Sequence, residues 1–177
     1  MRLFGKKKTL SDRLKGEAIS LGLCQQWQDG WRDDSSRDEL ADKFIRGIDF
    51  ATKHNWPSPE FIKNNFDPAF RHKWGVFIDE DINQASKPLG ALPGVLVFLG
   101  KNEGTLEFGR YDAKDIYVRH QGKLTIKASG NAMIHVTIYD DVELHAEATE
   151  DARIFIYRHG GQVWMTGRVV CRERRNS

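Results

Sequence analysis

The chain has only two cysteines and no long hydrophobic run. Cys24 and Cys171 lie far apart and form no CxxC pair, which excludes a disulfide scaffold and favours a reducing compartment. No apolar stretch approaches the roughly 20 residues of a membrane-spanning helix. The opening MRLFG is also shorter than a signal-peptide core of about 7–15 apolar residues. We therefore expect a cytoplasmic protein without a transmembrane segment.

Motifs that carry catalysis or cofactor binding are missing as well. The sequence has no glycine-rich phosphate loop, no HExxH zinc motif, no nucleophile elbow and no recognisable nucleic-acid module. Its 177 residues are 40% hydrophobic and 29% charged, which is typical of a soluble globular protein with a real core. These observations predict no cofactor and lean away from an enzyme.

Positive charge gathers at the two ends of the chain, although the net charge is only +2. A basic leader occupies residues 1–9, and a basic tail occupies residues 171–177. Each end carries too few cations for stable membrane attachment without a lipid or a longer helix. We expect at most a weak contact with an anionic surface through these termini.

The N-terminal third has the periodicity of amphipathic helices. Apolar residues recur every three or four positions from Leu10 to Trp31, where DDSS interrupts them. Ser36 then stands three residues before Glu39 in a capping-box arrangement, and the stripe continues to Ala51. Ser58-Pro59 is a further helix start. These signals predict three helices within a segment spanning residues 10–70.

From residue 75 the apolar residues alternate with period two, as in β-strands. The pairs also repeat along the chain at a period of about 19 residues. One series comprises Val76/Ile78, Val95/Val97, Ile116/Val118, Val136/Ile138 and Ile154/Ile156. A second series comprises Leu106/Phe108, Leu124/Ile126, Val142/Leu144 and Val163/Met165.

A third repeat marks the corners between these runs. ASGNA at 128–132 returns as ATEDA at 148–152, and Asp112-Ala113 matches the Asn131-Ala132 and Asp151-Ala152 pairs within them. About 19 residues suffice for one turn of a coil with short strands and tight corners. We therefore predict an α+β fold in which the helices pack on or cap a small parallel β-solenoid over residues 75–170. The alternative is an antiparallel sandwich or meander, with RHQGK, YDDV and RHGGQ as hairpin loops.

The alternation, the small polar corners and the opening MRLFGKKK resemble short parallel β-helices, among them the bactofilins, a family of bacterial cytoskeletal proteins. The resemblance covers the pattern of residues 75–170 and implies a solenoid that assembles with other copies. The helical segment departs from that family and indicates that one end of the solenoid is capped, which opposes polymerisation.

Two groups of residues are candidates for a ligand site. In stacked turns, one set of corners presents Arg119-His120, Asp140-Asp141 and Arg158-His159 together, either as a metal or anion site or as a cross-turn charge ladder. The outward aromatic residues Tyr117, Phe155, Tyr157 and Trp164 predict either a floor for the helices, a ligand groove or an oligomer interface. The metal content stays open.

We expect a non-enzymatic interaction or scaffold protein that associates through an exposed last turn near Val169–Val170. The alternative is a carbohydrate-binding or polysaccharide-acting β-helix that uses the Arg/His/Asp corner and the flanking aromatic residues. A DED run at residues 79–81 is expected to be a solvated loop.

Overall fold

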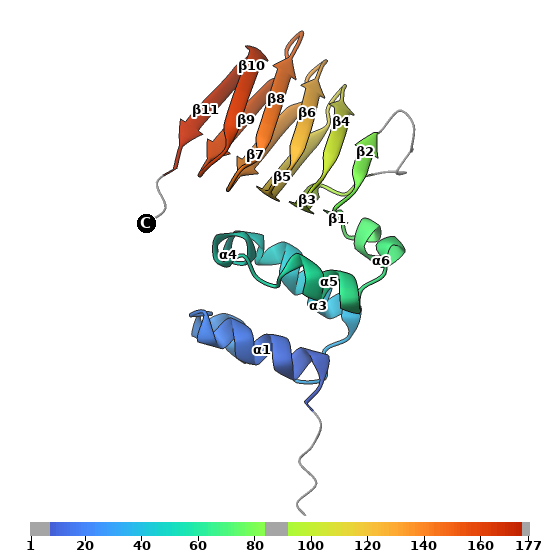
Figure 1. Cartoon of the computed structure of the whole chain (residues 1–177), viewed down its shortest axis with the longest axis vertical. Coiled ribbons are helices and arrows are strands. Elements are labelled where there is room, and N and C mark those ends of the chain that lie inside the picture. Colours follow the sequence, from blue (N-terminus) through green and yellow to red (C-terminus); the bar gives the residue numbers. More distant parts are fainter. Residues whose placement is uncertain (1–7, 84–91, 175–177) are drawn as a thin grey trace, which may run out of the picture. The chain divides into compact units, whose positions relative to one another are not determined.

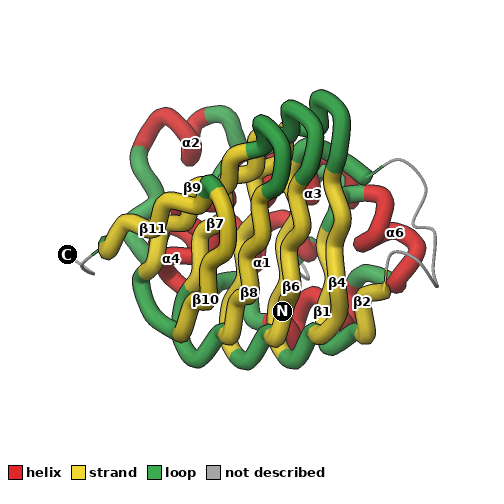
Figure 2. Tube along the Cα trace, turned by 90° about the horizontal axis from the view of Figure 1, so that it is seen from above, coloured by secondary structure: helices red, strands yellow, loops and turns green. Residues whose placement is uncertain are grey.

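The computed structural model describes residues 8–83 and 92–174. The basic leader therefore lies mostly outside the described residues, as do the last three residues of the basic tail. The chain divides into two compact units between Ser58 and Pro59. Each unit is described by itself below; Figure 1 labels the strands and the helices other than α2, which Figure 2 labels.

The first unit is helical. It contains α1 (Leu10–Ser20), α2 (Gln25–Asp29), α3 (Arg37–Arg46) and α4 (Ile48–His54). Ser36 and Glu39 form the predicted capping box at the start of α3, and Thr9 and Asp12 form a second one at α1. The buried side chains include Leu14, Ala18, Trp31, Leu40 and Ile48.

Two glycines divide what the periodicity predicts as longer helices. The expected helix from Leu10 to Trp31 ends at Ser20 instead, because Gly22 adopts a φ of 91° in the left-handed region. The expected continuation from Leu40 to Ala51 is interrupted at Gly47, which separates α3 from α4. The apolar stripe survives both breaks, so the periodicity conceals them.

The second unit begins with two more helices, α5 (Pro59–Asn65) and α6 (Pro68–Lys73). Pro59 starts α5 as the Ser58-Pro59 signal predicts, whereas α6 was not predicted. Eleven strands follow within the described residues. They are β1 (Val76–Ile78), β2 (Asp81–Asn83), β3 (Val95–Gly100), β4 (Glu103–Phe108), β5 (Ala113–His120), β6 (Lys123–Ala128), β7 (Met133–Ile138), β8 (Glu143–Ala148), β9 (Arg153–Arg158), β10 (Gln162–Gly167) and β11 (Val169–Glu173).

The strands form a parallel β-solenoid with two strands in each turn. Sheet A has the order β1-β3-β5-β7-β9-β11, and sheet B has the order β10-β8-β6-β4-β2. Every observed pairing is parallel, and successive turns lie side by side in Figure 2. The predicted solenoid is therefore confirmed. RHQGK, YDDV and RHGGQ are corners that join sheet A to sheet B, so they are not hairpin loops.

The apolar core lies between the two sheets. Inward positions stack in columns, so that Ile116 lies beside Val136 and Val136 beside Ile156 in sheet A. Leu124 lies beside Leu144 in sheet B. These five side chains are at most 1% exposed. A column of this kind excludes water along the whole coil, and burial of each such side chain contributes roughly 1.5–3 kcal/mol.

ASGNA and ATEDA form the same corner on consecutive turns. The N–H of Thr149 donates to the carbonyl of Ala128 at 2.9 Å, and that of Ser129 donates to Phe108 at 2.9 Å. Gly130 has a φ of 63°, and Arg110 and Glu150 adopt similar left-handed conformations on the neighbouring turns. The corner therefore repeats through its backbone shape, even where the residue in the left-handed position changes.

The true repeat is twenty residues along most of the coil, since Met133 pairs with Arg153 and Lys123 with Glu143. Several predicted registers are therefore wrong by one or two positions. Ala113 pairs with Met133 and is exposed, so it does not continue the buried column of Ala132 and Ala152.

Other members of the predicted series are displaced in the same way. Leu96 stacks on Ile116 and Phe98 on Val118, in place of Val95 and Val97. In sheet B, Leu106 pairs with Ile126, two positions from the predicted Leu124. The displaced pairs explain why the sequence spacings scatter around 19.

The N-terminal end of the solenoid is covered by α6. This helix contacts β1, and the ring of His72 stacks on Phe77 with centroids 4.8 Å apart. Arg71 and His72 both reach the carboxylate of Glu80, at 3.4 Å and 2.7 Å. The inward side chain Phe77 is only 1% exposed as a result. The β1 side of the first turn is therefore covered by α6.

Candidate functional site

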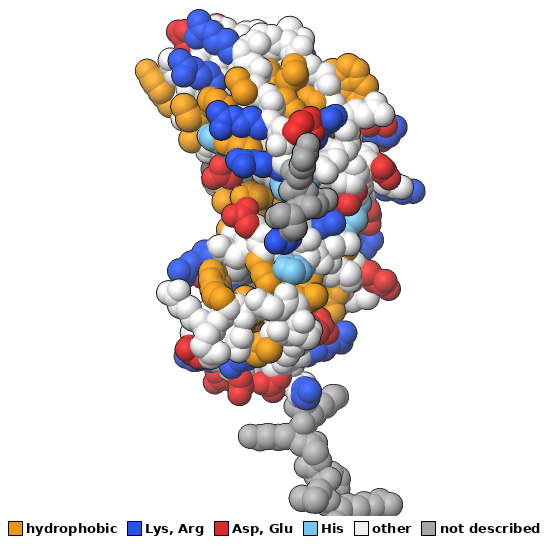
Figure 3. Space-filling view, turned by 90° about the vertical axis from the view of Figure 1, so that its left-hand side faces the viewer, with side chains coloured by type: hydrophobic (Ala, Val, Ile, Leu, Met, Phe, Trp, Pro, Cys, Tyr) orange, Lys and Arg blue, Asp and Glu red, His pale blue; other side chains and the backbone are white. Residues whose placement is uncertain are grey.

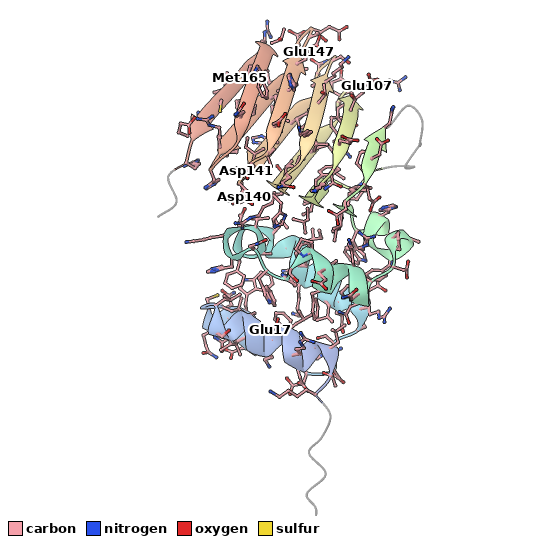
Figure 4. The ribbon with its side chains drawn as sticks, in the orientation of Figure 1. Glu17, Glu107, Asp140, Asp141, Glu147 and Met165 are labelled. Carbon is pink, nitrogen blue, oxygen red and sulfur yellow. The ribbon has the colours of Figure 1, made fainter. Side chains whose placement is uncertain are left out.

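The predicted Arg/His/Asp corner exists, at the ends of β5 and β7. Nε of Arg119 donates to Oδ2 of Asp140 at 2.8 Å, and the same oxygen accepts the N–H of His120 at 3.1 Å. Nδ1 of His120 accepts the N–H of Gly100 at 3.1 Å. Figure 4 labels Asp140 and Asp141 at this corner. The polar atoms of the corner therefore bond to one another, as a cross-turn ladder does.

The third part of this corner is displaced by one residue. The predicted alignment places Arg158 opposite Tyr139, but Arg158 pairs with Ile138 and bonds to Glu173 at 2.8 Å. His159 instead stacks on Tyr139 with ring centroids 4.4 Å apart. The guanidinium of Arg119 covers the same ring at 5.0 Å. His120 and His159 consequently lie in different columns.

Local interactions shift two pKa values at the corner. Burial lowers the pKa of His120, since desolvation disfavours the imidazolium. Burial alone raises the pKa of Asp140, but hydrogen bonds from Arg119 and from the His120 backbone outweigh it and lower the pKa. At neutral pH the corner thus holds a neutral imidazole beside a carboxylate that is already paired with a guanidinium. This arrangement stabilises the turn-to-turn register.

The predicted row of outward aromatic residues is divided between two faces. Tyr117 and Tyr157 lie on the outer face of sheet A together with Phe155, whereas Trp164 belongs to β10 in sheet B. Trp164 stacks on His145 with centroids 4.5 Å apart. The expectation of one continuous aromatic row was therefore wrong, because a corner separates β9 from β10.

The DED run lies in an acidic depression of about 630 Å³. Asp79 pairs with Lys63 of α5 at 2.7 Å, and Glu80 holds α6, so these two acids attach the helices to the first turn. The solvated-loop prediction is wrong for Glu80, whose side chain is 23% exposed, whereas Asp79 is exposed in the turn between β1 and β2. The depression is lined by Asp79, Glu80, Asp81, Lys101, Asn102, Glu103, Gln121, Lys123, Asp141 and Glu143.

The C-terminal end of the solenoid is open. In the described part of the chain β10 pairs only with β8, and β11 pairs only with β9, so each has a free edge. Met165 occupies the inward position next to Ala146, yet it is 51% exposed, and Trp164 and Val170 are 44% and 45% exposed. Ala146 in the same column is 3% exposed. Trp164 and Val170 point outward, whereas Met165, Val163 and Val169 are inward and only partly covered, so the open end presents core side chains between two sheet edges.

Figure 4 labels Met165 on β10 in the last turn, and Figure 3 views the molecule from the side on which this end lies. The predicted association surface near Val169–Val170 forms part of the end. Met165 was not predicted there, since its exposure depends on the absence of a further turn beside β10 among the described residues.

Comparison with protein-family models finds no match, and neither the curated proteins nor the solved structures give a significant match. The predicted parallel β-helix is present, whereas no match supports the resemblance to bactofilins in particular. None of the described helices is long and apolar enough to cross a membrane. Among the described residues, no cluster of three or more His, Cys, Asp or Glu side chains is arranged to hold a metal ion.

Proposed function

We propose that this protein is a non-enzymatic assembly protein whose solenoid associates with a second copy through its open C-terminal end. The observation that carries the proposal is the contrast between the two ends. Phe77 is 1% exposed at the end that α6 covers, whereas Met165 is 51% exposed at the other. Two free sheet edges with apolar side chains between them are a template for further β-structure.

A second copy fits this surface better than a single extended peptide does. Two packed sheets lie about 10 Å apart, and a peptide strand would extend only one of them. The same end of another solenoid presents two edges at the same separation. A two-fold axis across the end brings the edge strands together antiparallel, a pairing in which both backbones can form hydrogen bonds.

The coverage of the other end limits the assembly to two copies. Because α6 contacts β1 and His72 stacks on Phe77, the first turn exposes no core side chain like Met165 among the described residues: Phe77 and Ile82 are 1% and 3% exposed. Head-to-tail growth is therefore blocked, and a closed dimer is expected instead of a filament.

The size of the end sets the expected affinity. A six-residue strand is about 20 Å long, and two sheets with their side chains are about 20 Å thick, so each copy buries about 400 Å². This is about half of the roughly 800 Å² per partner in a standard stable interface. We therefore expect a dissociation constant in the micromolar to millimolar range.

The test is sedimentation velocity from about 10 µM to 1 mM, the range that this affinity requires. The wild-type chain should shift from monomer to dimer, and Met165→Glu should stay monomeric. Met133→Glu is the matched control, because Met133 is also a strand methionine and is 45% exposed on a middle turn. A wild-type chain that stays monomeric at 1 mM contradicts the proposal, as does equal loss in both variants.

A further inference from the structure

The outer face of sheet A near the C-terminus combines basic, aromatic and apolar side chains. It is formed by the outward residues of β7, β9 and β11, and Arg174 extends it by one position. We call this set the basic-aromatic face. Its members are Met133, His135, Thr137, Arg153, Phe155, Tyr157, Val170, Arg172 and Arg174.

Three cations of this face are available to a partner. Arg153, Arg172 and Arg174 are exposed, and no carboxylate among the described residues forms an ion pair with them. Arg158 and Arg168, by contrast, are paired with Glu173 and Asp151. The outer face of sheet B has the opposite character, because Glu103, Glu107, Glu143 and Glu147 alternate there with Lys123 and Lys127. The solenoid is therefore electrostatically two-sided.

The rings of the basic-aromatic face stand upright on the sheet. His135 stacks on the neighbouring Phe155 with centroids 5.1 Å apart and ring planes inclined by 22°. His135 and Tyr157 are also parallel to within 12°. Rings stacked from strand to strand turn their edges, and not their faces, toward solvent. The guanidinium of Arg174 lies over the Tyr157 ring, 5.2 Å from its centre, and covers that ring face.

This orientation selects between two anionic partners. Single-stranded nucleic acid binds aromatic side chains through open ring faces on which bases stack. A membrane interface accepts upright aromatic rings and exposed apolar side chains beside arginines. Met133 and Val170, each 45% exposed, are apolar side chains of the latter kind.

We propose that the basic-aromatic face is a docking surface for anionic lipid bilayers, with Arg153, Arg172 and Arg174 at the headgroups. The proposal does not depend on self-association, since it uses the outer face of sheet A and not the open core. Figure 3 shows basic and hydrophobic side chains together on the solenoid near this end.

The test is cosedimentation with unilamellar vesicles of phosphatidylcholine, with and without about 30% phosphatidylserine, at physiological ionic strength. The wild-type chain should bind only the anionic vesicles. The variant Arg172→Glu/Arg174→Glu should bind at least about 30-fold more weakly, because each lost cation near an anionic surface costs about fivefold. Lys123→Glu/Lys127→Glu changes the net charge equally on the opposite face and should bind nearly as well as the wild type.

Three results would overturn the proposal. One is equal loss in both double variants, which would make binding a property of net charge alone. Another is full loss on deleting residues 1–8, which would assign binding to the leader. The third is tight binding of single-stranded polyuridylate with none to the vesicles. Circular dichroism of each variant establishes that it is folded, and Met165→Glu should leave vesicle binding unchanged.

Discussion

Leu144 and Val163 occupy the same inward column of sheet B, and truncating each to alanine should give very different losses of stability. Leu144→Ala removes three carbon atoms, worth about 2.4 kcal/mol at about 0.8 kcal/mol per carbon. Leu144 is 0% exposed, and the turns on either side are fixed by parallel ladders, so the site cannot collapse. The remaining cavity raises the expected loss to about 4 kcal/mol.

Val163 lies in the last turn and is half-buried. Val163→Ala removes two carbon atoms that are partly in water already, and water fills the space they leave. The expected loss is therefore about 1 kcal/mol, which leaves a difference of about 3 kcal/mol between the two variants.

Urea denaturation followed by circular dichroism at about 218 nm measures this difference. If the two variants have the same dependence of the unfolding free energy on urea concentration, the shift of the unfolding midpoint gives the change in stability. The far-UV signal at that wavelength reports the strands. Equal losses for Leu144→Ala and Val163→Ala would refute the reasoning, because they would mean that the last turn is as well covered as the inner ones.

Three further changes test other parts of the structure. Ser36→Ala should cost about 1 kcal/mol, seen as a lower unfolding midpoint of the helical unit, whereas Ser36→Gly should cost only a few tenths; equal costs would argue against the side-chain cap. Gly104→Ala should destabilise the solenoid strongly in the same urea assay, because Gly104 has a φ of 137° and the added Cβ would lie 1.5 Å from the Ile82 carbonyl oxygen. An unfolding midpoint within error of the wild type would contradict the packing of β2 on β4. Burial lowers the pKa of His120, so the pKa in the folded protein lies below that in the unfolded chain. The free energy of unfolding should therefore be highest above about pH 6.5 and should fall as the pH drops through the folded pKa. His120→Asn tolerates the φ of 77° and should reduce this fall between pH 7.5 and 5.5, so an unchanged pH profile would count against the buried neutral imidazole.

Alternation along the chain predicts which residues point inward, but it does not fix the register between turns. The run Val95–Leu99 is apolar at every position, so the sequence cannot show that Leu96 and Phe98 face the core. A slip of two positions, as at Leu106, preserves the alternation and is equally invisible. The corner ASGNA, by contrast, gives the twenty-residue offset directly, because it returns as ATEDA and both copies place a buried alanine, Ala132 or Ala152, at the same position.

The candidate site was predicted only in part. Arg119, His120 and Asp140 come together because one corner repeats on two turns. Arg158 and Trp164 do not join them, because their positions depend on where β9 ends and the corner before β10 begins. Met165 is exposed because no further strand covers it, and Arg172 has no carboxylate partner among the described residues. The residue pattern within a strand does not show which side chains of other strands lie beside it.

Scalar couplings across hydrogen bonds, measured by NMR on the deuterated protein, identify the strand pairing most directly. Stacked turns predict couplings from the amide of Thr149 to the carbonyl of Ala128, from Arg153 to Ala132 and from Met133 to Asp112. Couplings that join these amides to carbonyls of the sequence-adjacent strand, as in a hairpin, would contradict the coil and both surfaces inferred from it.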